Sequence, residues 1–148
     1  MISFILVSCK TSLKNNQTQK DMAMETEKNK ESLTRSAVDR FNEAFNRHNV
    51  DDVMNAMTED CIFENTSPQP DGTRLVGAKD VREYWKKFFT NNPDAFFEAE
   101  DVFVSGDRCV VRWIYRKTKD GKPWHLRGVD VFKVRDGKVL EKLAYVKG

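Results

Sequence analysis

The pattern of apolar and polar residues divides the chain into three parts. Residues 1–7 are apolar, and residues 10–32 are mainly polar with no sustained apolar period. Such an abrupt change is typical of a processed leader, and a polar stretch buries too little surface to order itself. We therefore expect a signal over residues 1–9, a disordered tether over residues 10–32 and one folded domain over residues 33–148.

Within the domain, apolar residues recur first at helical and then at strand spacing. The helical stripes predict a helix over residues 33–47, a short helix from residue 50, and a helix that follows Gly77 and ends at Asn92. Alternating segments predict strands at residues 60–65, 96–104, 108–118, 122–134 and 138–147. The last four strands are separated by Gly106-Asp107, Asp120-Gly121 and Asp136-Gly137. This order predicts an α+β fold with three helices on one side of an antiparallel sheet.

The turn at Asp120-Gly121 sets the pairing of the strands on either side of it. A two-residue turn places Lys119 opposite Lys122, and counting inward defines the two faces of the hairpin. The pairs on one face are Tyr115 with Leu126, Trp113 with Gly128, Val111 with Asp130 and Cys109 with Phe132. This face is almost wholly apolar, whereas the reverse face is mostly polar, so we expect the apolar face to point inward.

The same treatment of Asp136-Gly137 extends the inner face to the last strand. It places Leu143 beside Asp130 and Tyr145 beside Gly128. The inner face then holds Trp113, Gly128 and Tyr145 in a row, and the missing side chain of Gly128 leaves room between two rings. A slip of one residue at either turn would exchange the faces.

Asp130 is the one acid on this predicted inner face. Burial disfavours the ionised form and can raise a carboxyl pKa by roughly 3 to 5 units unless a cation or several donors compensate. Arg127 lies three residues away on the same strand and points to the other face. We therefore expect Asp130 to bind a donor on Tyr115, Tyr145 or Trp85, or to stay protonated. It can then serve ligand binding, acid–base chemistry or a purely structural role.

Composition and charge exclude several classes of function. The 25 Lys and Arg residues are balanced by 23 Asp and Glu, and the two signs are mixed along the chain, which argues against nucleic-acid binding. The two His and three Cys residues are scattered, which argues against a zinc site. We expect no cofactor and no metal.

The first residues carry a second signal. Leu6-Val7-Ser8-Cys9 resembles the lipobox of bacterial lipoproteins, in which the cysteine is lipidated. The resemblance makes Cys9 a candidate lipid anchor and implies a bacterial cell-envelope location, with membrane contact only through the lipid. A chance cysteine in a disordered leader is the alternative, and a cytoplasmic protein would follow from it. Seven apolar residues are too few for a transmembrane helix.

Four segments share their order and spacing with a known family. They are RFNEAFNRHN (40–49), DCIFEN (60–65), the helix start from Gly77 to Trp85, and RGVDVF (127–132) with DGKV (136–139). Over residues 34–148 the chain resembles the SnoaL-like branch of the nuclear transport factor 2-like superfamily, which includes polyketide cyclases and ketosteroid isomerase. The resemblance implies a cone-shaped, curved antiparallel sheet with the helices on its concave side, as in cystatin-like folds, and a homodimer formed through the outer sheet surface.

The isomerase pattern carries over only in part. Asp130 falls where the isomerases place the acid that donates to the substrate oxyanion. Their general base corresponds to Asn65, and their donor tyrosine corresponds to Phe41, so two of three roles are absent. Glu64 would supply a base only if its strand were shifted by one residue. Polyketide cyclases of the family use a single acid in an apolar pocket, which Asp130 matches.

Three functional hypotheses follow. The first is a binding protein whose pocket holds a small planar or lipidic compound, with candidate ligand-binding residues Phe41, Phe45, Phe63, Asn65, Trp85, Trp113, Tyr115, Gly128 and Tyr145. The second is an enzyme of the cyclase, isomerase or hydrolase type that uses Asp130 as acid or base. The third is a non-catalytic, dimeric interaction module. The sequence does not separate them.

Overall fold

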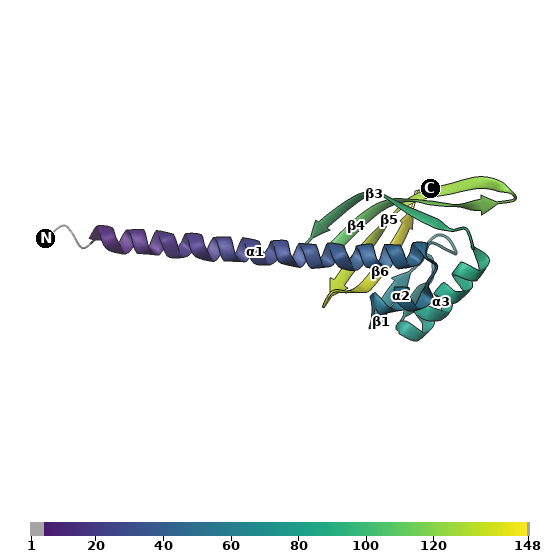
Figure 1. Cartoon of the computed structure of the whole chain (residues 1–148), viewed down its shortest axis with the longest axis horizontal. Helices are drawn as coiled ribbons and strands as arrows, with labels where there is room; N and C mark the ends of the chain where they lie inside the picture. Colours follow the sequence, from purple (N-terminus) through teal and green to yellow (C-terminus); the bar gives the residue numbers. More distant parts are fainter. Residues whose placement is uncertain (1–4, 148) are drawn as a thin grey trace.

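The structure is a computed structural model that describes the backbone of residues 5–147 and the side chains from residue 18 onward. Its helices are α1 (Ile5–Asn46), α2 (Val50–Asn55) and α3 (Ala78–Asn91). Its strands are β1 (Met57–Glu64), β2 (Arg74–Val76), β3 (Phe96–Ser105), β4 (Arg108–Lys119), β5 (Lys122–Arg135) and β6 (Lys138–Val146). One curved sheet with the order β2-β1-β6-β5-β4-β3 is crossed by α1, and α2 and α3 lie near the C-terminal end of α1 (Figure 1). The predicted α+β fold is confirmed.

The sheet is mixed, which corrects the expectation of a wholly antiparallel one. β1 runs parallel to β6, with Ile62 opposite Glu141, and the short strand β2 adds an edge beside β1. Parallel neighbours need a long connection, and here the whole chain from β2 to β5 separates the two strands. A pairing across such a distance leaves no turn signal in the sequence.

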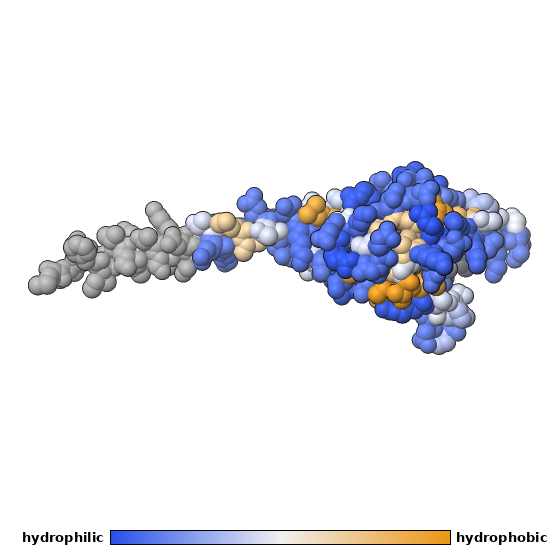
Figure 2. Space-filling model, turned by 90° about the horizontal axis from the view of Figure 1, so that it is seen from below, coloured by the Kyte–Doolittle hydropathy of each residue, from blue (hydrophilic) through white to orange (hydrophobic). Residues whose placement is uncertain are grey.

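The first helix begins at Ile5, well before the residue 33 expected from the apolar stripe. Lys, Glu, Gln and Met have high helix propensity, and the chain has no Gly or Pro before Pro68. This part of the helix needs no apolar stripe because it packs little against the domain, and the side chains of residues 18–30 are all exposed. Figure 2 shows that the beginning of this stretch stands clear of the domain. Within the described part of the chain, no helix combines the length and apolar character needed to cross a bilayer.

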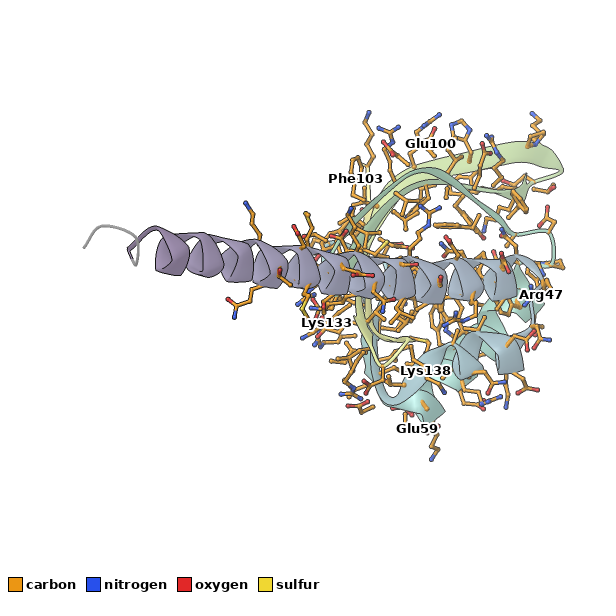
Figure 3. The ribbon with its side chains drawn as sticks, turned by 60° about the vertical axis from the view of Figure 1, so that its left-hand side comes forward. Arg47, Glu59, Glu100, Phe103, Lys133 and Lys138 are labelled. Atoms are coloured by element: carbon orange, nitrogen blue, oxygen red, sulfur yellow. The ribbon has the colours of Figure 1, made fainter. Side chains whose placement is uncertain are left out.

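Side-chain hydrogen bonds hold α1 on the concave face of the sheet. Buried Thr34 donates its hydroxyl to the Gly106 carbonyl at 2.8 Å, at the turn between β3 and β4. At the other end, the Asn46 amide donates to the Phe97 carbonyl and accepts from the Phe97 N–H, both at 2.8 Å. Figure 3 shows the sheet curving around the helix, with Glu100 and Phe103 on one side of α1 and Glu59 and Lys138 on the other.

The register of the β4–β5 hairpin agrees with the prediction. Lys119 pairs with Lys122, Trp113 with Gly128, and Val111 with Asp130. Asp120 and Gly121 both adopt positive φ, as a two-residue turn that matches the twist of the strands requires.

The predicted register of the β5–β6 hairpin is wrong by one residue. Arg135 pairs with Lys138 as expected, but an irregularity follows Val134 and leaves Leu140 without a partner in the register. Beyond this bulge, Asp130 pairs with Ala144 instead of Leu143. An extra residue in one strand exchanges the faces of everything after it. Lys142 is therefore buried on the inner face, and Tyr145 is half exposed on the outer one.

Candidate functional site

A cavity of about 130 Å³ lies between the sheet, the end of α1 and α3. Its wall is mainly aromatic and includes Phe45, Phe63, Tyr84, Trp85, Phe88, Phe97, Trp113 and Tyr115. The remaining lining residues are Asn65, Thr66, Leu126, Asp130, Lys142 and Ala144. A dry cavity of about 150 Å³ accommodates benzene, whereas sites for drug-sized ligands start near about 300 Å³. The space therefore suits a single small ring and is too small to enclose a lipid.

Trp85 of α3 organises the aromatic wall. Its ring stacks on Phe63 of β1 at a centroid distance of 4.7 Å and meets Phe45 of α1 edge to face at 5.7 Å. Phe41, one turn before Phe45 on α1, packs behind Trp85 at 5.9 Å. The two rings therefore share one face of α1, and Phe45 lines the cavity while Phe41 is buried in the core one turn away.

Gly128 allows Trp113 to lie flat against β5. A Cβ atom at residue 128 would lie 2.5 Å from Cζ2 of Trp113 and 2.2 Å from the carbonyl oxygen of Tyr145. No side chain fits there without a shift of the backbone. The glycine therefore positions the Trp113 ring from beneath and lies outside the cavity wall, and the predicted gap between the rings of Trp113 and Tyr145 does not form because Tyr145 is on the outer face.

Asp130 and Lys142 form a buried ion pair on the cavity wall. Lys142 Nζ lies 2.7 Å from Asp130 Oδ2, and the two side chains are 9% and 1% exposed. The ammonium also lies over the rings of Phe63 and Phe132, at 5.2 and 5.7 Å from their centroids. Lys142 is a partner that the sequence analysis missed, because the predicted register turned its side chain outward.

Burial raises the pKa of Asp130 above its ordinary value, and the positive charge of Lys142 opposes this rise. The Trp113 indole also lowers the pKa of Asp130, although its N–H makes no complete hydrogen bond.

Several polar atoms of the cavity wall are buried without a hydrogen bond. Against all described residues, they are Nε1 of Trp85, Nε1 of Trp113, the hydroxyl of Tyr115 and Oδ1 of Asp130, whereas Oδ2 of Asp130 faces the ammonium of Lys142. Buried polar groups are normally satisfied, and each orphan costs about 1–3 kcal/mol. Donors and acceptors of this kind thus gather on the wall of one small aromatic cavity.

The structure brings most of the predicted site residues together. Those that line the cavity are Phe45, Phe63, Asn65, Trp85, Trp113, Tyr115 and Asp130. Phe41 and Gly128 support the wall from behind, and Tyr145 lies on the outer face because of the bulge in β6. Tyr84 and Phe88 were missed although they belong to the apolar side of α3. Cys9, the candidate lipid anchor, lies outside the described side chains.

Asn65 has a structural task that differs from that of a general base. Its Oδ1 atom accepts hydrogen bonds from the N–H groups of Ser67 at 3.1 Å and Thr73 at 2.8 Å. The residue therefore organises the loop between β1 and β2, and Glu64 beside it pairs with Arg74 at 3.3 Å. Among residues 18–147, no cluster of His, Cys, Asp or Glu is arranged to hold a metal ion.

Comparison with solved structures places this architecture among known folds. An NTF2-like protein of unknown function from Mesorhizobium loti is 34% identical and has a TM-score of 0.69, with 80% of this chain and 94% of that chain covered. A provisionally assigned polyketide cyclase from Xanthomonas campestris pv. campestris is 20% identical, with a TM-score of 0.64 and coverage of 80% and 93%. A hypothetical protein with a ketosteroid isomerase-like fold from Catenulispora acidiphila DSM 44928 is 12% identical, with a TM-score of 0.66 and coverage of 74% and 83%.

Sequence comparison agrees with the structural one. No curated protein matches the chain. The SnoaL-like domain family matches over residues 38–142, the span that holds the end of α1, the sheet up to the middle of β6 and the whole cavity wall apart from Ala144. The chain therefore belongs to the SnoaL-like family and has the NTF2-like fold.

Proposed function

We propose that the domain binds a small aromatic molecule that carries a hydroxyl or carbonyl oxygen. The observation that supports this is the cavity itself, in which the indole N–H groups of Trp85 and Trp113 lack acceptors beside the Asp130–Lys142 pair. The rings of the wall offer stacking partners for a planar molecule. An oxygen on the ligand would accept from the orphan donors, and a hydroxyl would also donate to the carboxylate.

Phenol and toluene form a matched pair for testing this proposal, because they have nearly the same shape and differ in one oxygen. Hydrogen bonds to charged groups contribute about 1.5–3 kcal/mol, so phenol should bind about 10-fold to 150-fold more tightly than toluene. The titration is followed in ¹⁵N–¹H NMR spectra through the three indole N–H signals. Those of Trp85 and Trp113 should shift, whereas Trp124, which does not line the cavity, serves as the internal control.

Two results would contradict the proposal. Equal binding of phenol and toluene would mean that the orphan polar groups do not recognise oxygen. A shift confined to Trp124 would place the ligand at the tip of the β4–β5 hairpin instead of the cavity.

An enzyme that uses Asp130 as acid or base is a second candidate, favoured by the position of this carboxyl beside Lys142 on the cavity wall. Asn65 cannot act as the isomerase base, because an amide does not accept a proton at neutral pH and its oxygen is engaged by the loop. An activity of this class would rest on Asp130, and Asp130→Asn should abolish turnover of any substrate found. Unchanged turnover in that variant would remove Asp130 from the mechanism.

A further inference from the structure

We propose that the natural ligand extends beyond the cavity as an uncharged aliphatic tail, which lies in a groove between the β1–β2 loop and the end of β6. This inference rests on the proposed function, since it takes the ring of the ligand to occupy the cavity. It adds a second binding site and defines the ligand as a ring with an oxygen substituent at one end and an apolar chain at the other.

The groove adjoins the cavity directly. It has a volume of about 620 Å³ and is lined by residues of the β1–β2 loop, among them Gln69 and Pro70, and by Tyr145 and Val146 of β6. Asn65, Thr66 and Ala144 line both the groove and the cavity. These three shared residues lie at the border of the two spaces, and the side chain of Ala144 is a single methyl group.

The end of the β1–β6 pairing leaves the last residues of β6 without a neighbouring strand on the β1 side at this place. The last pair joins Glu64 to Leu143, and β6 continues to Val146 without β1 beside it. After Glu64 the chain turns into the loop, which is closed by its own hydrogen bonds, including that from the Gly72 N–H to the Pro68 carbonyl at 2.8 Å. The loop therefore keeps its shape without help from β6, and the edge of residues 144–146 remains open to a ligand.

The residues of the groove determine which kind of tail fits. Tyr145 offers a half-exposed ring, and Pro70, Ala144 and Val146 add apolar surface next to it. The carboxylate of Glu64 is neutralised by Arg74 at 3.3 Å, and Asp71 contributes a further acid. An anionic tail would be repelled by this acid, whereas an aliphatic chain gains by covering the ring of Tyr145.

The test compares phenol with 4-butylphenol on the full chain by isothermal titration calorimetry. Each fully buried methylene group improves affinity about fourfold, and a chain that is partly covered in an open groove should improve it at least 10-fold in total. Tyr145→Ala should lower the affinity for 4-butylphenol at least fivefold and leave that for phenol unchanged, because Tyr145 does not line the cavity. Phe103→Ala is the matched control, since Phe103 is similarly exposed, at 60% against 50% for Tyr145, but lies on β3 and does not line the groove.

The outcomes separate this inference from the proposed function. If phenol binds and the butyl chain adds nothing, or if Tyr145→Ala and Phe103→Ala weaken 4-butylphenol equally, the groove is not a tail site and the cavity proposal stands. If neither phenol nor 4-butylphenol binds, both proposals fail. A loss that is specific to Tyr145→Ala and to the longer ligand supports the groove.

Discussion

Replacing Lys142 with methionine would leave the Asp130 carboxylate buried without its ion-pair partner. Asp130 is 0% exposed and the ammonium of Lys142 lies at 2.7 Å, while methionine keeps most of the apolar volume of the side chain. Removing one partner of a buried pair typically costs about 3–5 kcal/mol, because the remaining charge is desolvated and uncompensated. We expect Lys142→Met to lose this amount of unfolding free energy near pH 8, measured by urea denaturation.

The loss should depend on pH in a direction that follows from the pKa of Asp130. Burial raises the pKa of Asp130 in the folded protein above its value in the unfolded chain. The protonated carboxyl group therefore stabilises the folded state below the unfolded pKa, and this stabilisation is lost as the pH rises through the folded pKa. Lys142 opposes the rise, so its removal shifts the folded pKa further upward. The difference between wild type and Lys142→Met should therefore shrink toward about pH 5, by at most about 1.36 kcal/mol per pH unit.

Two variants control this experiment. Arg108→Met breaks the pair with Glu141 on the outer surface, where Arg108 is 49% exposed, and should cost less than about 1 kcal/mol at either pH. Asp130→Leu combined with Lys142→Met removes both charges and should recover most of the stability. A loss in Lys142→Met that stays below about 1 kcal/mol and does not change with pH would refute the buried pair and the register that creates it.

Two further substitutions test the supports of the cavity. Gly128→Ala should destabilise the domain by about 1–3 kcal/mol in urea denaturation, because the added Cβ would meet the Tyr145 carbonyl and the Trp113 ring. It should also displace the NMR signal of the Trp113 indole N–H. An unchanged denaturation midpoint and an unchanged spectrum would mean that the ring does not lie against residue 128. Asn46→Ala should cost about 1–3 kcal/mol by leaving the Phe97 N–H and carbonyl unpaired, and Asn46→Asp, which keeps only the acceptor, should recover part of it. Equal stability of all three Asn46 proteins would show that α1 does not hold the edge of β3 through this side chain.

Most of the secondary structure was predictable because it depends on local patterns. The β4–β5 register was correct to the residue, since a two-residue turn with positive φ at Asp120 and Gly121 admits one pairing. The β5–β6 register failed at Leu140, because an extra residue in a strand has no signature in an alternating pattern. The start of α1 was missed for a related reason, as a stripe of apolar residues reports burial and a fully exposed helix has none.

The homodimer, the lipid anchor at Cys9 and the envelope location stay predictions. The structure holds a single chain without a partner, and its side chains are described only from residue 18 onward, beyond Cys9. Ligand binding by the cavity residues is likewise a proposal, for which phenol and 4-butylphenol are the probes.

By itself, the sequence determined the order of helices and strands, the inward face of the first hairpin and the burial of Asp130, because turn residues and side-chain periodicity act over a few neighbouring positions. Only the tertiary structure decided that β1 pairs in parallel with β6 and that Lys142, instead of Tyr145, faces Asp130. Both depend on contacts between strands far apart in the chain or on one unpaired residue, and neither changes the local pattern. The electrostatics of the candidate site follow from that single unpaired residue, because it exchanges the faces of the strand beyond it.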